Sequence, residues 1–141
     1  MAFTDTVREY DYDRYICSLF AGEKQREALH ILYAFNLEIA RIYEAVNEPM
    51  AGLARLAWWG GEIEKIYDGG VRTNHELLTS ISQIIAEYNL SKEQLLGLIN
   101  SHEHDFDEQP PTHIGQLEEY VLGTSSALLL LASEILGGGA E

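Results

Sequence analysis

Apolar residues recur at helical spacing along most of the chain. The clearest stripe lies between residues 23 and 46, where successive apolar positions are separated by four, three, four, three and four residues. These positions are Ala28, Leu32, Phe35, Ile39, Ile42 and Val46. Such steps place side chains on one face of an α-helix. Because no run shows the two-residue alternation of a strand, we predict an all-α fold.

Proline, glycine and capping residues divide this pattern into about six helices. The first two are expected over residues 5–21 and 23–46, separated by a glycine. Pro49 opens a third helix that reaches residue 67, because proline is favoured at the first helical position. A glycine-containing turn at residues 68–70 follows.

Three further helices are expected in the second half of the chain. Their predicted N-caps are Asn74, Ser91 and Thr112. The first ends near residue 88, the second starts in an S-x-x-Q capping box and frays near Asp105, and the third runs to Leu136. Two prolines at 110–111 force an extended connection before the last helix. The short loops indicate an antiparallel bundle.

Two segments place glycine inside predicted helices. They are Gly60–Gly61 and the small-residue run 123–127. Glycine in a helix interior costs about 1 kcal/mol relative to alanine, so its presence needs a reason. We interpret both segments as tight helix crossings. The alternative is a ligand that lies against the bare backbone.

Length and composition are those of a single globular domain. The 141 residues are 46% apolar, and a chain of this size buries about two-thirds of its unfolded surface. The net charge of −14 argues against non-specific nucleic-acid binding, which needs lysine and arginine, and disfavours an anionic membrane surface.

Compartment and membrane signals are weak in this sequence. The single cysteine, Cys17, cannot form an internal disulfide, so we expect a reducing compartment and a cytoplasmic location. Asp5 and Glu9 stand where a signal peptide would be basic. The most apolar run, residues 127–132, is far shorter than the ~18 residues of a spanning helix. We therefore predict a soluble protein with no transmembrane segment.

Three local features suggest chemistry, and each has a simpler explanation. The acidic and histidine-rich string 102–108 contains metal-ligating residue types, but His102 and His104 are about 200° apart around a helix and cannot converge on one ion. We interpret it as a solvated helix end. Cys17 is more often a small core residue than a nucleophile. For Trp58–Trp59 we expect one ring in the core and the other at an interface.

The second predicted helix carries a second line of residues beside its apolar stripe. This line is Tyr33, Leu37, Ala40 and Glu44. All-α enzymes that act on polyphosphates place carboxylates one turn apart on facing helices, where their oxygens hold Mg²⁺. Here the line has one carboxylate, Glu44, and an alanine one turn earlier. One carboxylate is a poor Mg²⁺ site.

Two stretches resemble the squalene/phytoene synthase family. Residues 25–41 read QREALHILYAFNLEIAR, and residues 48–59 read EPMAGLARLAWW. Their combination is similar to a divergent branch that includes mitochondrial assembly factors for respiratory complex I and their bacterial relatives. Residues 120–124, YVLGT, resemble a later helix of the same family. The resemblance extends over about residues 11–137.

This resemblance implies an isoprenoid-synthase-like fold, of which the chain is expected to be an N-terminal portion truncated at its C-terminal side. Family enzymes condense two prenyl diphosphates head to head with Mg²⁺ held between two aspartate-rich motifs. The aspartates of the first motif fall on Ala40 and Glu44, and the arginine before them falls on Leu37. The second motif would lie beyond residue 137.

The resemblance also implies which residues contact substrate and metal. The implied substrate-binding positions are Tyr33, Leu37, Arg41 and Gly123. Glu44 is the implied metal ligand. The first motif is degenerate, because Leu37 and Ala40 replace an arginine and an aspartate. We therefore assign no catalytic residue.

Three functional hypotheses follow from the resemblance. In the first, the chain is a family member without prenyltransferase activity of its own, with a prenyl-binding or assembly role and no cofactor. In the second, it is the N-terminal part of a Mg²⁺-dependent enzyme completed by another chain. In the third, it is a protein-interaction module that uses Trp58 and Trp59. The expected partners are a prenyl diphosphate or isoprenoid lipid, and a protein or a second copy that covers an exposed apolar face.

Overall fold

The computed structural model describes residues 2–69, 74–107 and 109–137, and within them helices are the only regular secondary structure, which confirms the all-α class. The first half contains α1 (Ala2–Tyr10), α2 (Tyr12–Ser18), α3 (Glu23–Ala40), α4 (Ile42–Ala45) and α5 (Pro49–Tyr67). The second half contains α6 (Glu76–Tyr88), α7 (Lys92–Ser101), the 3-10 helix η1 (His102–Phe106), α8 (Ile114–Val121), the π-helical segment η2 (Leu122–Ser126) and α9 (Ala127–Leu136).

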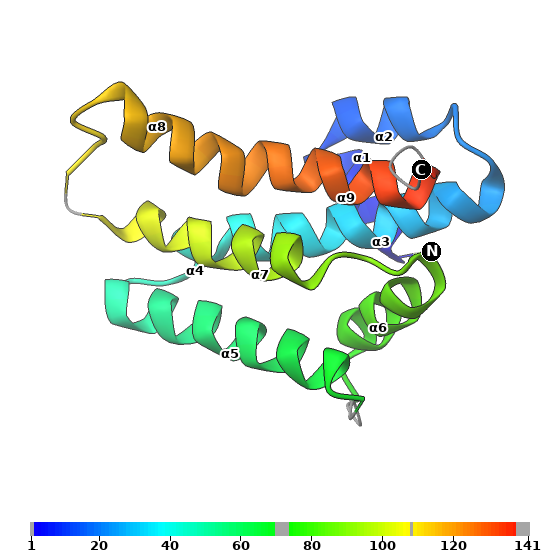
Figure 1. Cartoon of the computed structure of the whole chain (residues 1–141), viewed down its shortest axis with the longest axis horizontal. Coiled ribbons are helices and arrows are strands. Elements are labelled where there is room, and N and C mark those ends of the chain that lie inside the picture. The colour runs from blue at the N-terminus through cyan, green and yellow to red at the C-terminus, as the bar shows by residue number, and fades with distance from the viewer. Residues whose placement is uncertain (1, 70–73, 108, 138–141) are drawn as a thin grey trace.

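The helices form layers around α3 and α7 (Figure 1). α7 packs against α5 on one side and against η2 and α9 on the other, and it runs opposite to both neighbours. α3 contacts α1, α6 and α9. The predicted antiparallel packing is therefore confirmed for α5, α7 and α9.

The core is formed by the predicted apolar stripes. Phe35, Leu32 and Ile39 of α3 are at most 1% exposed. The facing helices contribute further fully buried side chains, which are Leu56, Ile63, Leu78, Ile81, Leu95, Leu98, Ile99, Leu131 and Ile135. Each buried side chain of this size contributes about 1.5–3 kcal/mol, so the shared core holds these helices together.

Two predicted long helices are interrupted. The expected helix over residues 5–21 is broken at Asp11, and α2 ends at Ser18. The expected helix over residues 23–46 is broken at Arg41, which ends α3 with φ −92° and ψ 0° and also precedes α4. A hydrophobic period continues across a one-residue break, which explains why the stripe predicted a single helix.

Two predicted caps are wrong by one residue. α6 is capped by His75 and α8 by His113, where Asn74 and Thr112 were expected. In each case the imidazole Nδ1 accepts a hydrogen bond from the backbone N–H three residues later, at 3.4 Å and 3.3 Å. Ser91 caps α7 as predicted, through Gln94 N–H to Ser91 Oγ at 3.4 Å.

The C-terminal helix is continuous in length but changes its winding at η2. The predicted close approach of Gly123 is confirmed, because a Cβ on this residue would overlap the side chain of Ser101 in α7. The other predicted crossing is wrong, since no other described segment comes within 4 Å of a Cβ built on Gly60 or Gly61. Sequence reasoning overlooked Gly52, where a Cβ would overlap the ring of Phe106.

The described residues include one helix that could cross a membrane by length and composition alone. It runs over Ile114–Leu136, 23 residues, and contains an 18-residue stretch with mean hydropathy 1.3, of which 33% is buried inside the protein. The sequence did not predict this helix as a candidate span, because Glu118 and Glu119 interrupt its run of apolar residues. Core helices of water-soluble proteins also meet this criterion, so the absence of a transmembrane segment stays a prediction.

Cys17 differs from its expected environment, whereas the tryptophan pair has the expected one. Cys17 is a free, exposed thiol, so its interpretation as a small core residue is wrong. Of the tryptophan pair, Trp59 is 4% exposed and Trp58 is 47% exposed, which confirms that one ring faces the core.

A buried histidine joins the first three helices. His30 of α3 is 3% exposed. Ser18 Oγ donates to the carbonyl of Tyr15 at 2.6 Å, so it accepts from Nε2–H of His30 at 2.7 Å. This leaves Nδ1 of His30 as the acceptor for the Thr4 hydroxyl at 2.9 Å. The neutral imidazole thus satisfies both hydroxyls.

The free energy of unfolding is expected to fall as the pH is lowered through about 6.5 because of His30. Burial, helped by the positive charge of Arg26, lowers the pKa of His30 from 6.5. Below pH 6.5 the unfolded chain binds a proton that the folded protein does not, so stability is present above that pH and is lost below it. One such group changes stability by at most about 1.4 kcal/mol per pH unit.

Urea unfolding at a series of pH values measures this effect. In His30→Gln the side chain keeps a hydrogen-bonding role but does not titrate, so its stability should depend less on pH than that of the wild type. Parallel pH profiles for the two proteins would contradict the assignment.

Candidate functional site

Most of the substrate and metal positions that the resemblance implies lie around the break between α3 and α4. Because α3 ends at Ala40 and α4 starts at Ile42, the side chains before and after Arg41 face one cavity. This cavity has a volume of about 360 Å³, and Leu37, Arg41 and Glu44 all line it. Three of the positions chosen from the sequence are therefore brought together.

The remaining predicted positions lie apart from this cavity. Ala40 is on the last turn of α3 but does not line the cavity, and Tyr33 lies one turn before Leu37 on the same helix. Burial raises the pKa of the half-buried Tyr33, whose ring lies 6.0 Å from the Arg14 guanidinium carbon. Gly123 packs against Ser101 of α7.

Sequence reasoning missed three polar residues that line the same cavity, besides the apolar Ala34, Ile42 and Ala45. The polar residues are Thr6, Glu38 and Arg55. Glu38 lies one turn before Ile42, and Arg55 lies in the second turn of α5. The spacing of Glu38 and Arg41 within one helix turn was visible in the sequence, whereas the approach of Thr6 and Arg55 depends on the tertiary fold.

The cavity contains two carboxylates and two guanidinium groups. The Arg41 guanidinium carbon lies 4.1 Å from the ring centroid of Tyr10, a cation–π contact that holds the side chain against α1. Within residues 2–69, 74–107 and 109–137, Arg55, Glu38 and Glu44 have no ion-pair partner. The site can therefore accept an anionic group through Arg55 without breaking an ion pair.

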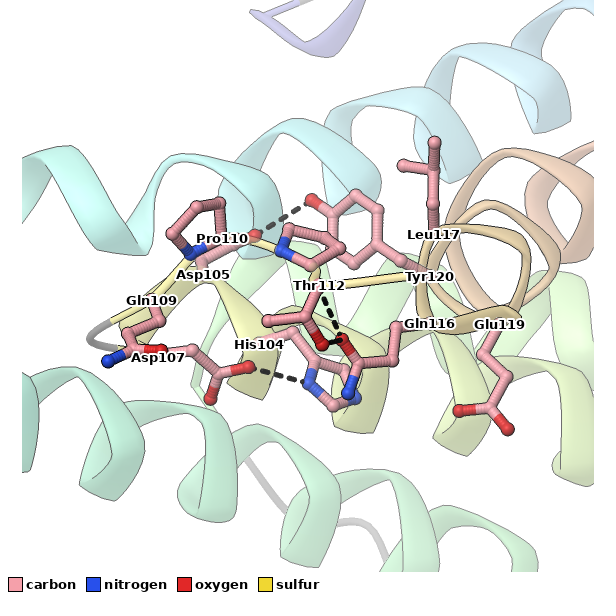
Figure 2. A pocket seen from close by; sticks show the side chains of 11 residues that line it. His104, Asp105, Asp107, Gln109, Pro110, Thr112, Gln116, Leu117, Glu119 and Tyr120 are labelled. Carbon is pink, nitrogen blue, oxygen red and sulfur yellow. Dashed lines mark hydrogen bonds and ion pairs between the residues drawn. The ribbon is translucent and has the colours of Figure 1, made fainter. Parts of the chain in front are cut away.

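A larger cavity lies beyond the C-terminal end of α7, between η1 and α8 (Figure 2). Its volume is about 730 Å³, and its walls come from η1, the proline-containing connection and the first two turns of α8. Asp105, Asp107 and Glu119 contribute carboxylates, and Pro110, Leu117 and Tyr120 contribute apolar surface.

Asp105 is fixed by two neighbours at the wall of this larger cavity. His102 Nδ1 lies 2.7 Å from Asp105 Oδ2, and the Tyr120 hydroxyl donates to Asp105 Oδ1 at 2.7 Å. Burial raises the pKa of Asp105, but the hydrogen bonds from His102 and Tyr120 outweigh it, and the pKa is lowered overall. Burial, together with the negative charge of Asp105, raises the pKa of Tyr120 to about 12. Asp105 is thus ionised and Tyr120 protonated at neutral pH.

Metal ligands do not converge in the described parts of the chain. Across these residues, no group of three or more histidine, cysteine, aspartate or glutamate side chains is arranged to hold a metal ion. In the histidine-rich string, His102 pairs with Asp105, and His104 Nδ1 pairs with Asp107 Oδ2 at 2.9 Å. Glu108 lies outside the described residues. The string does lie at a helix end, but its interpretation as solvated is wrong for His102, which is 6% exposed, and holds for the exposed His104–Asp107 pair.

Comparison with known proteins identifies a family and a set of relatives. A family model described as squalene/phytoene synthase matches residues 7–141. The human and bovine proteins named NADH dehydrogenase (ubiquinone) complex I, assembly factor 6, are each 32% identical over 133 residues, and their Drosophila melanogaster homolog is 32% identical over 140 residues. These alignments cover 94%, 94% and 93% of this chain, respectively, and 40% of each relative. No solved structure matches the chain significantly.

Proposed function

Because the chain belongs to the squalene/phytoene synthase family, we propose that it is a helical assembly domain of that family without Mg²⁺-dependent prenyltransferase activity of its own. The observation that carries the proposal is the cavity at the α3–α4 break. Leu37 stands there where the resemblance implies an arginine, and Ala40 stands nearby where it implies an aspartate. Glu44 remains as the implied metal ligand.

The chemistry of the family explains why these two replacements matter. A departing diphosphate is stabilised by Mg²⁺ and basic groups acting together, and each such electrostatic contribution is worth several kcal/mol. Glu44 and Glu38 are the only carboxylates that line the described cavity, and two carboxylates hold Mg²⁺ poorly, since this ion prefers several oxygen ligands in near-octahedral geometry. Roles for Tyr33, Leu37, Arg41 and Gly123 in contacting a prenyl chain remain predictions.

Two observations support an assembly role. The relatives carry the name of a complex I assembly factor, and the chain spans about two-fifths of their length. In addition, the helix Ile114–Leu136 exposes a row of large apolar side chains, with Ile114, Leu122 and Leu129 each at least 65% exposed. Neighbouring exposed apolar side chains of this kind occur at contact sites for proteins or membranes. By analogy, the proposed partner is a protein of a respiratory-complex assembly pathway.

Farnesyl thiodiphosphate is expected to show no Mg²⁺-dependent binding to the chain. The reason is that Leu37 and Ala40 supply neither the charge nor the oxygen ligands that a magnesium diphosphate needs. Isothermal titration calorimetry with and without Mg²⁺, together with an assay for pyrophosphate released from farnesyl diphosphate, measures this. Micromolar binding that requires Mg²⁺ would contradict the proposal and favour the second hypothesis, in which another chain completes the enzyme.

A chimera tests the assembly role directly. In it, this chain replaces the matching 40% of human assembly factor 6. In human cells that lack the factor, the chimera is expected to restore complex I activity above the empty vector. A control chimera carrying Leu37→Arg and Ala40→Asp should restore it equally, because the proposed role does not use a diphosphate site. A folded chimera that leaves complex I activity at the empty-vector level would count against the assembly role.

A further inference from the structure

The cavity between η1 and α8 is separate from the α3–α4 cavity and has no role in the function proposed so far. The two cavities share no lining residue. At about 730 Å³ it falls in the size range of sites that hold a small molecule or a large side chain. It is formed by the fold itself, since the rigid Pro110–Pro111 connection and the start of α8 enclose it.

The carboxylates that line this cavity make it negatively charged. Asp105, Asp107 and Glu119 line it, and none of its lining residues is a lysine or arginine. The two oxygens of Asp105 are engaged by His102 and Tyr120, and Asp107 Oδ2 is engaged by His104. Glu119 has no hydrogen-bond or ion-pair partner within the described residues. The cavity therefore has unused acceptor capacity on Asp107 and Glu119.

The geometry places these acceptors beside an apolar wall. Figure 2 shows Asp107 and Glu119 on either side of His104 and Gln116, with the Tyr120 ring and Pro110 above them. Both carboxylates are exposed to solvent, so their attraction for a cation is that of surface charges, and the neighbouring apolar groups add contact surface for the aliphatic part of a ligand. A ligand that matches both surfaces has an aliphatic stem and a positively charged end, as lysine and arginine do.

We infer that this cavity is a docking site for a lysine or arginine side chain presented by a protein partner, with the charged end beside Asp107 or Glu119 and the aliphatic stem against Pro110 and Tyr120. The inference deepens the proposed assembly role, on which it rests, by naming the chemistry of the partner. The net charge of −14 attracts basic segments from a distance, and the cavity selects one side chain among them.

Peptide binding tests the inference. The probes are acetyl-Leu-Arg-Leu-amide and the same peptide with glutamine in place of arginine. The arginine peptide is expected to bind and to shift the NMR signals of the Tyr120 ring and the His104 ring, whereas the glutamine peptide is expected to bind at least about tenfold more weakly. Binding of the arginine peptide should weaken with added salt.

Two charge-matched double variants separate the cavity from general attraction. Asp107→Asn with Glu119→Gln removes the two acceptors and is expected to weaken arginine-peptide binding about tenfold. Glu103→Gln with Glu118→Gln removes two charges from exposed neighbours that do not line the cavity, and is expected to change binding less than about twofold.

Three outcomes overturn the inference. They are equal weakening in both double variants, equal binding of the arginine and glutamine peptides, and binding without shifts at Tyr120 and His104. Each of them concerns this cavity alone, whereas Mg²⁺-dependent binding reports on the α3–α4 cavity and the chimera reports on the assembly role of the whole chain. Failure of this docking site is thus distinguishable from failure of the proposed function.

Discussion

Replacing Gly52 with alanine is expected to destabilise the protein by about 1–3 kcal/mol. Gly52 is buried in α5, and a Cβ at this position would overlap the ring of Phe106 in η1. Backbone and ring must then move apart, and this movement separates α5 from the segment that follows α7. Chemical denaturation followed by far-UV circular dichroism measures the loss.

Gly61→Ala is the matched control for this prediction. Gly61 lies in the same helix, but no other described segment comes within 4 Å of a Cβ built there. The same substitution should therefore stabilise the protein by up to about 1 kcal/mol through helix propensity alone. In Gly52→Ala with Phe106→Leu, the total loss should be smaller than the sum of the single losses. Losses that add fully would show that the Gly52–Phe106 contact does not cause the effect.

Asp105→Ala is expected to cost about 2–3 kcal/mol of unfolding free energy. The substitution removes the carboxylate that accepts the hydrogen bond of the Tyr120 hydroxyl. It also removes the hydrogen-bond partner of His102, and His102 is only 6% exposed. A buried donor left without a partner carries its full desolvation cost. Because Tyr120 lies in α8 and His102 follows α7, the loss should loosen the contact between these two helices.

Asp107→Ala provides the comparison for Asp105. Asp107 pairs with His104 in the same segment and at the same sequence spacing, but both side chains are more than half exposed. Exposed ion pairs contribute about 0–1 kcal/mol, so this variant should stay close to the wild type. Similar losses in the two variants would show that the network around Asp105 does not stabilise the fold.

Much of the fold could be predicted from the sequence because hydrophobic period and capping chemistry are local. The stripe of Leu32, Phe35 and Ile39 predicts which face of α3 is buried, and Pro49 predicts the start of α5 at the observed residue. The one-residue shifts at His75 and His113 have a physical reason. A neutral imidazole can accept the same hydrogen bond as an asparagine or threonine oxygen, and sequence preferences for caps give it little weight.

The features that could not be predicted depend on how helices approach each other. Gly60–Gly61 and Gly52 are alike in sequence, yet only Gly52 meets another segment, because η1 crosses α5 at that position. For the candidate site, resemblance chose Leu37, Arg41 and Glu44, and the fold added Arg55 from α5 and Thr6 from α1. Residues from other helices enter a site through tertiary packing, which no local pattern encodes.

The start of α7 has a consequence for the order in which the chain folds. The backbone N–H of Ser91 donates to Glu134 Oε2 at 2.9 Å, across 43 residues of sequence. In the expected capping box, a side chain only three residues away would have satisfied this group. The first turn of α7 is therefore complete only after α9 has docked. A contact of such sequence separation forms late and slowly, so α7 and α9 should gain their final protection from hydrogen exchange together as one cooperative unit.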